Sequence, residues 1–386
     1  MIKLNQISIN NAIKLVLFII YFTVNLLFVI KYGVRQNKIS VSILIAAFLV
    51  LHFFLYKSQL FLDKIKISNK ALALFVVITV LIFLFLCHLI DSPYKVNIDR
   101  WQTIEYCLED WLKGNFFYHK PNFIGQMPSY LPGQLLAAAG FYLLGNVGYL
   151  QVASFILFVA TLIKLFPNNN IRFLAVFLLI TSLSFIYEIV CKSDFISSFI
   201  FAAAFIIFWH KRFPDDYLER PFLLGLILAF LCLTRSLVVI PLILFLFKSF
   251  IKADNMKKLI SVLGFIISFS LLLATVILPV KSFEYLREYN PLKTQSQGSE
   301  YIMMIFLILT VLISFYIKNI QQVFFCSTII LFLLIGSFLI ESSLKGIAYN
   351  HLGITYLASS LPFAIIGYCL TISKKFTIKS TNKIFG

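Results

Sequence analysis

The sequence predicts an all-helical membrane protein with about 12 transmembrane helices and one long exterior loop. Of its 386 residues, 60% are hydrophobic and only 13% are charged. Apolar runs of about 20 residues recur along the chain, and a helix needs that length to cross a hydrocarbon layer of roughly 30 Å. The runs are continuous rather than alternating, which favours helices over a closed barrel.

The predicted spans are the apolar runs that separate the charged segments. They lie near 12–30, 40–56, 71–90, 147–165, 172–190, 195–209, 222–233, 236–247, 259–279, 301–317, 321–341 and 352–372. The first run is too long for the core of a signal peptide and has no small-residue cleavage site, so an uncleaved helix is expected there. No polar segment is long enough to fold separately, and residues 1–386 are therefore expected to form a single polytopic domain.

The lysines and arginines predict the orientation of the spans. Segment 57–70 carries four lysines against one acid, which places it in the cytoplasm. The next span then puts the acidic loop 91–146 outside, and the basic tail 373–386 ends inside. One basic segment contradicts the rule because it falls on the exterior side: Lys31, Arg35 and Lys38.

Two apolar segments need a separate decision. Region 221–248 fits best as two short spans that meet at Arg235, because this returns the following basic cluster to the cytoplasm. It also places the arginine at an exterior turn, where it avoids the several kcal/mol that a lone charge at mid-bilayer costs. Segment 131–145 is short and follows prolines, so it is expected to be an interfacial or re-entrant helix.

Composition also limits the function classes. The formal net charge is +17, but the cations lie in short clusters between spans, where they set orientation and meet anionic headgroups, so nucleic-acid binding is not expected. The six cysteines show no metal-ligand spacing and are assigned to packing. No glycine-rich nucleotide loop occurs, so any donor substrate is expected to be membrane-borne.

The exterior loop contains the first candidate site residue, Asp99, followed by Arg100. After Asp99, apolar side chains recur at helical spacing to Trp111, which predicts an amphipathic helix anchored on the membrane surface by tryptophans. Asp99 lies at headgroup depth, where it could take a proton from an acceptor hydroxyl. The alternative is an N-cap for the helix, and the residues alone leave both open.

Further candidates lie on the same predicted face. Tyr118 and Tyr130 offer rings on which a sugar could stack, although an ordinary ordered loop explains them as well. The turn after 172–190 adds Lys192 and Asp194, and the turn at Arg235 adds a guanidinium suited to a lipid-linked phosphate, or simply to headgroups. The last exterior turn adds His351.

These segments together resemble the polytopic glycosyltransferases of the GT-C fold, which use polyprenyl-phosphate-linked sugars (mannosyltransferase-like and aminoarabinose-transferase-like). The resemblance rests on Ile-Asp-Arg-Trp at 98–101, a Gly-x-x-x-Tyr step at 114–118, Ser-Tyr-Leu-Pro-Gly at 129–133, Lys-Ser-Asp at 192–194 and Leu-Thr-Arg at 233–235. It is densest over 96–240. Three spans precede the loop where the family usually has one, and the exterior C-terminal domain of some members is absent.

The resemblance implies an inverting sugar transfer at the outer face of a bacterial cytoplasmic membrane. Asp99 matches the general base on the acceptor, a lipid-linked or cell-envelope glycan. Arg235 matches the contact to the donor phosphate, and Asp194 a second acid that orients the acceptor or a divalent cation. Arg100, Tyr118, Tyr130, Lys192 and His351 are expected to line the substrate site. No metal site is clearly encoded, and the need for a cation stays open.

Three other functions compete with this interpretation. A transporter or flippase for lipid-linked oligosaccharides would need charges deep within the spans, which are nearly free of them. A surface-polysaccharide polymerase shares the topology and substrates but usually has a larger, arginine-rich second exterior loop. A catalytically inert assembly protein is the third alternative.

Overall fold

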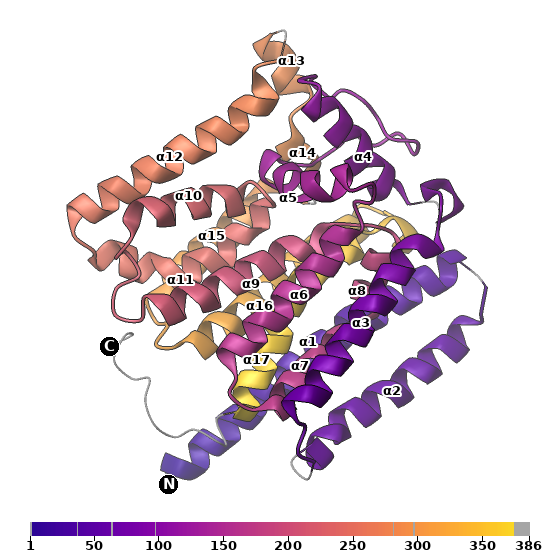
Figure 1. The fold of residues 1–386 in the computed structure, drawn as a ribbon, viewed down its shortest axis with the longest axis vertical. Helices are drawn as coiled ribbons and strands as arrows, with labels where there is room; N and C mark the ends of the chain where they lie inside the picture. Colours follow the sequence, from indigo (N-terminus) through magenta and orange to yellow (C-terminus); the bar gives the residue numbers. More distant parts are fainter. Residues whose placement is uncertain are drawn as a thin grey trace.

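The structure, a computed structural model, describes residues 2–36, 38–62, 65–96, 98–280, 282–295 and 298–373. The predicted basic tail from 374 onward lies outside these residues. Across the described ranges every regular element is helical (Figure 1). The all-α prediction is therefore confirmed.

The first half of the chain forms the helices α1 to α9. Their bounds are α1 Ile2–Gln36, α2 Val41–Leu62, α3 Asn69–Leu89, α4 Asp99–Leu112, α5 Pro132–Leu143, α6 Tyr149–Leu165, α7 Asn169–Ile180, α8 Leu183–Val190 and α9 Phe195–Arg212, with a 3-10 turn η1 at Pro93–Val96.

The second half contributes α10 to α17 and three further 3-10 turns. Their bounds are α10 Pro221–Cys232, η2 Ser236–Val238, α11 Val239–Lys252, α12 Asn255–Ile277, α13 Phe283–Glu288, α14 Pro291–Gln295, α15 Glu300–Ser314, α16 Ile320–Leu344, η3 Tyr349–His351, η4 Ile354–Ser360 and α17 Leu361–Ser373.

The expected number of about 12 spans is not supported. Among the described residues, six helices are long and apolar enough to cross a membrane, or up to seven if the bent pair α7–α8 is one span. Helices do occupy the other predicted positions, but several are short: α10 has 12 residues, and α11 and α15 have 14 and 15. At about 1.5 Å per residue, these helices fall short of a hydrocarbon layer of roughly 30 Å. The apolar helices support a multi-pass membrane protein with fewer complete crossings than predicted.

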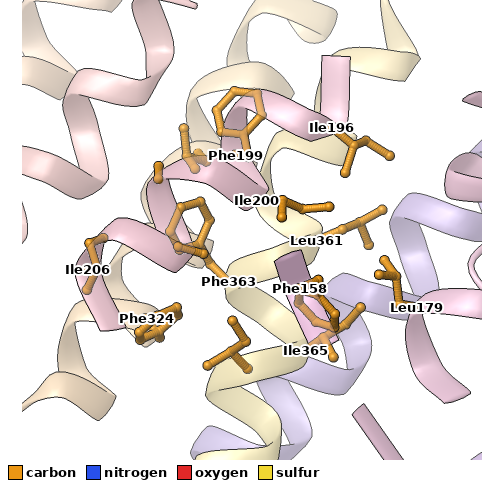
Figure 2. Packing of buried hydrophobic residues seen from close by; sticks show 14 of the residues in the cluster. Phe158, Leu179, Ile196, Phe199, Ile200, Ile206, Phe324, Leu361, Phe363 and Ile365 are labelled. Carbon is orange, nitrogen blue, oxygen red and sulfur yellow. The ribbon is translucent and has the colours of Figure 1, made fainter. Parts of the chain in front are cut away.

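The main core forms where α6, α7, α9, α16 and α17 meet. Figure 2 shows Phe199 and Ile200 of α9 beside Leu361 and Phe363, with Phe158 close by. All five side chains are essentially inaccessible. Nearly all of α9 between Phe195 and His210 is buried, so protein surrounds this helix on all sides and fixes the position of the site at its first turn.

A second hydrophobic cluster lies at the end of the molecule opposite the N-terminus, where α4 and α5 pack together (Figure 1). It is built on α4, whose residues Trp101, Ile104 and Leu108 are buried against the loop that follows the helix. The predicted helix 99–113 is confirmed. The predicted anchoring of Trp101 in the membrane surface is wrong, because protein side chains cover it. The apolar stripe of α4 faces the loop and α5.

The predicted break at Arg235 is present. Helix α10 ends at Cys232, and α11 begins at Val239 after the short turn η2. Helix α10 then packs against α12 through two glycines: a Cβ on Gly225 would lie 2.2 Å from the carbonyl oxygen of Ser261, and one on Gly264 would lie 2.6 Å from that of Phe222. The two backbones can approach this closely only without side chains.

Candidate functional site

Charged side chains from three separate segments meet where α9 begins. Asp194 directly precedes α9, and its Oδ2 accepts a hydrogen bond from Arg235 at 2.9 Å. The side chains of Arg235 and Asp194 are only 7% and 1% exposed. Arg235 is thus buried and paired, rather than open at an exterior turn as predicted. Asp194 raises the pKa of the guanidinium against the opposing effect of burial.

Arg100 forms the second arginine–carboxylate pair of the cluster. Its Nη1 lies 3.8 Å from Oε1 of Glu188, and it donates hydrogen bonds to Ser193 at 3.2 Å and Thr355 at 2.9 Å. The side chain is 22% exposed, so this pair is looser and more accessible than the first. Burial disfavours the charge of Arg100, but Tyr356 and Glu188 outweigh burial and raise its pKa.

Phe195 lies between the two guanidinium groups. The guanidinium carbon of Arg100 is 5.7 Å from the centre of its ring, and that of Arg235 is 5.5 Å away. Tyr130 adds a further ring 5.3 Å from Arg235. Aromatic faces attract cations without neutralising them, so the rings hold both charges close together.

Glu188 belongs to a helix that is interrupted. Helices α7 and α8 are bent by 61° relative to each other. Asn25 of α1 holds the break, because its side-chain oxygen accepts hydrogen bonds from the hydroxyls of Ser182 at 2.8 Å and Ser184 at 3.2 Å. The bend directs the end of α8, with Glu188, toward Arg100.

Side-chain amides fix the backbone of the 188–194 turn. Gln151 donates to Oε2 of Glu188 at 3.1 Å and to the carbonyl oxygen of Ser193. The amide N–H of Ile196 donates to the same carboxylate at 2.8 Å. Both acids of the turn are therefore positioned by contacts from other helices as well as by their arginines.

Tyr130 links the loop between α4 and α5 to this cluster. Its hydroxyl donates to the carbonyl oxygen of Arg100 at 3.1 Å, and its own carbonyl oxygen accepts a hydrogen bond from Tyr118 at 2.6 Å. Tyr118 and Tyr130 are 2% and 3% exposed. In this structure neither ring presents a free face to a sugar, so their contribution is to hold the loop against Arg100 and Arg235.

Asp99 is partly exposed at the first turn of α4. Ile98 is the N-cap residue, so the alternative that Asp99 caps the helix is wrong. Instead, its Oδ2 accepts a hydrogen bond from Asn122 at 2.8 Å. Asp99 also interacts electrostatically with Arg100 and Tyr130, which places it at the border of the cluster.

Lys192 contacts α4 through Trp101. Its Nζ lies 3.5 Å from the centre of the Trp101 ring, and the residue has a left-handed φ of 49°. Burial lowers the pKa of this lysine, while Glu105 acts in the other direction. A non-glycine residue in this region of φ carries strain, which the fixed turn maintains.

His351 lies away from the cluster, and the described residues contain no group of metal ligands. His351 is exposed in η3, and no contact within the described residues brings its side chain into the cluster. Among the described residues, no group of three or more His, Cys, Asp or Glu side chains could hold a metal ion. The structure thus brings together Asp99, Arg100, Asp194 and Arg235.

Sequence analysis did not select Glu188, Phe195 or Thr355. A usable signal existed for Glu188, because it is an acid inside an otherwise apolar run, six residues before Asp194. Phe195 and Thr355 belong to residue types common in every span, so only the folded chain reveals them.

No family model, curated protein or solved structure matches this chain.

Proposed function

We propose that the protein is a membrane glycosyltransferase that transfers a sugar from a polyprenyl-phosphate donor to a lipid-linked or cell-envelope glycan at the outer face of a bacterial cytoplasmic membrane. One observation carries the proposal: Asp99, Arg100, Asp194 and Arg235 come from three distant segments and gather around Tyr130 and Phe195. Sugar transfer from a phosphate-linked donor uses an acid that accepts the proton of the acceptor and cations that stabilise the phosphate. The cluster contains both kinds of side chain at one end of the helical bundle.

The roles follow from exposure and pairing. Asp99 is partly exposed and is oriented by Asn122, so it is the group best placed to accept the proton of an acceptor hydroxyl. Arg235 would balance the charge of a donor phosphate. Its Nε and Oδ1 of Asp194 are buried with no hydrogen-bond partner among the described residues, and substrate groups can satisfy them.

An apolar cavity supports a lipid-borne donor. It measures about 270 Å³ and lies between α10, α11 and α12. Cys232 and Val239, on either side of the turn that carries Arg235, contribute to its lining. A hydrocarbon chain in this cavity would bring its phosphate close to that turn, which suits a prenyl chain.

Replacement of Asp99 tests the proposal. Asp99→Asn keeps the hydrogen bond from Asn122 but cannot take up a proton, so sugar transfer in isolated membranes should fall by roughly 10²-fold or more. Asp91→Asn is the matched control, because Asp91 is an exposed acid of the same loop paired only with Lys95. Wild-type transfer by Asp99→Asn at equal protein levels would exclude Asp99 as the base.

A lipid-linked-oligosaccharide transporter is the second candidate, and the break between α7 and α8 favours it. Interrupted helices that end in buried charges are common at the substrate sites of transporters. Movement of a fluorescent lipid-linked sugar across proteoliposomes, without any transfer of sugar, would support this function over the first.

A further inference from the structure

Two aromatic rings near Asp99 take no part in the proposed proton transfer or phosphate binding. Tyr94 belongs to η1, and Phe123 belongs to the loop between α4 and α5. Their ring centres are 5.1 Å apart, and their planes are inclined by 59°. Tyr94 is 61% exposed and Phe123 is partly exposed. At this inclination neither ring covers the face of the other, so the pair offers the accessible aromatic surface that the buried Tyr118 and Tyr130 lack.

Hydrogen bonds hold Phe123 close to Asp99. The side chain of Asn122, the residue before Phe123, donates to Oδ2 of Asp99 at 2.8 Å. The amide N–H of Phe123 donates to Oε1 of Gln102 at 3.2 Å. Gln102 lies three residues after Asp99 in α4, so the two side chains are neighbours on one face of the helix. The aromatic pair is therefore tied to the first turn of α4 by two hydrogen bonds.

Three polar atoms around the aromatic pair form no hydrogen bond within the described part of the chain. They are Oδ1 of Asp99, Nε2 of Gln102 and the hydroxyl of Tyr94. The first is an acceptor, the second is a donor, and the hydroxyl can act as either. All three residues are at least partly exposed, so a ligand that lies on the rings can reach these atoms.

The chemistry of this surface matches a neutral sugar. The C–H groups on the faces of a pyranose ring pack against aromatic rings. The hydroxyls at its edge donate and accept hydrogen bonds, as the polar atoms around Tyr94 do. A hydrocarbon chain would leave the polar atoms of Asp99 and Gln102 without a partner, and a phosphate would be repelled by the carboxylate of Asp99.

We propose that Tyr94, Phe123 and Gln102 bind the sugar of the acceptor and direct one of its hydroxyls toward Asp99. The assignment to the acceptor rests on the proposed transferase function, whereas the binding of a neutral sugar here does not. The two aromatic rings pack on the face of the sugar, and Nε2 of Gln102 donates to a neighbouring hydroxyl.

Binding of methyl glycosides to the full-length protein in zwitterionic nanodiscs tests the subsite. The probes are the methyl glycosides of glucose, galactose, mannose and N-acetylglucosamine, and saturation-transfer NMR measures their binding. Tyr94→Ala should weaken the binding of the preferred glycoside by roughly tenfold, because one of the two stacking surfaces is lost. Phe283→Ala is the matched control, since Phe283 is an aromatic residue of α13 that is 76% exposed, and it should leave the affinity unchanged. Binding of none of the four glycosides, or equal affinity in the wild type and Tyr94→Ala, would overturn the proposal.

Phe123→Leu separates contact with the sugar from packing of the loop. Leucine keeps an apolar side chain and the backbone N–H that donates to Gln102, so thermal unfolding should change little. The affinity for the glycoside should nevertheless fall several-fold, because the flat aromatic face is lost. Wild-type affinity in Phe123→Leu would show that the ring does not contact the sugar and would overturn the proposal.

Insertion of the rings into the bilayer is the alternative that the fluorescence of Tyr94→Trp tests. The added tryptophan should change its emission when the glycoside is titrated. Quenching of that emission by brominated lipids, without a response to any glycoside, would place the ring in the bilayer and overturn the subsite.

The subsite and the transferase function can fail separately. Glycoside binding that depends on Tyr94 and Phe123 in a protein that transfers no sugar would support the subsite and refute the proposed function. Sugar transfer that is equally fast and has the same KM for the acceptor in the wild type and Tyr94→Ala would support the function and refute the assignment to the acceptor.

Discussion

The two arginine–carboxylate pairs on either side of Phe195 have similar chemistry but opposite physical character. Arg235 and Asp194 form a contact of 2.9 Å and are almost completely buried. Arg100 and Glu188 are 3.8 Å apart, and Arg100 remains 22% exposed. The first pair fixes the turn between α10 and α11 to α9, whereas the second keeps a cation accessible. The two pairs thus leave their arginines accessible to a ligand to different degrees.

The largest effect is expected from breaking the tighter pair. Asp194→Asn removes the charge that compensates Arg235, and an uncompensated buried charge costs about 3–5 kcal/mol. Thermal unfolding in detergent should show a large loss of stability. Asp216→Asn is the matched control, because Asp216 and its partner Lys257 are 39% and 43% exposed, and a pair of that kind contributes about 1 kcal/mol or less. Similar losses for the two variants would contradict the distinction between buried and exposed pairs.

The looser pair should respond differently. Glu188→Gln retains an oxygen to accept from Gln151 and Ile196, so the stability should change by only about 1 kcal/mol. It also removes the carboxylate that lies 3.8 Å from Arg100, so an anionic lipid such as dodecyl phosphate should bind to the protein in zwitterionic nanodiscs several-fold more tightly, since roughly 1.4 kcal/mol corresponds to a tenfold change. Affinity that falls in Glu188→Gln, measured in the same nanodiscs, would show that Arg100 needs its carboxylate to be positioned.

The sequence predicted where the helices lie along the chain better than how deeply their side chains are buried or which residues they contact. Apolar runs and basic turns locate the break at Arg235, because a lone arginine in a long apolar run is expensive wherever it lies. They do not reveal that Asp194 would bury it, since that contact joins residues 41 positions apart. Trp101 shows the same limit. Its helical spacing predicts an apolar face, but spacing cannot distinguish a membrane surface from a protein surface.

Lys31 and Arg35 are basic residues that disagree with the predicted orientation of the spans. Lys31 donates to the carbonyl oxygen of Leu352, and Thr355, three residues further on, accepts a hydrogen bond from Arg100. A local conflict with a general preference often marks a functional site. The position of Asp99 at the start of an amphipathic helix was predicted from the spacing of apolar residues, and its role as a base stays a prediction. Its orientation by Asn122, however, depends on the path of an irregular loop.

The smallest effect is expected from Gln295, which contacts the turn that carries Arg235. Gln295 in α14 donates to the carbonyl oxygen of Ser129 at 2.6 Å and accepts from the amide N–H of Ser236 at 3.2 Å, so it joins the loop between α4 and α5 to the turn that carries Arg235. Gln295→Ala removes both hydrogen bonds and should reduce the stability by about 1 kcal/mol, because solvent can replace them at this partly exposed position. If Gln295 also excludes water from Arg235, amide hydrogen exchange at residues 234–238 should be faster in Gln295→Ala than in the wild type, while exchange in α9 stays unchanged. Exchange at 234–238 as slow as in the wild type would show that the turn is held by Asp194 alone.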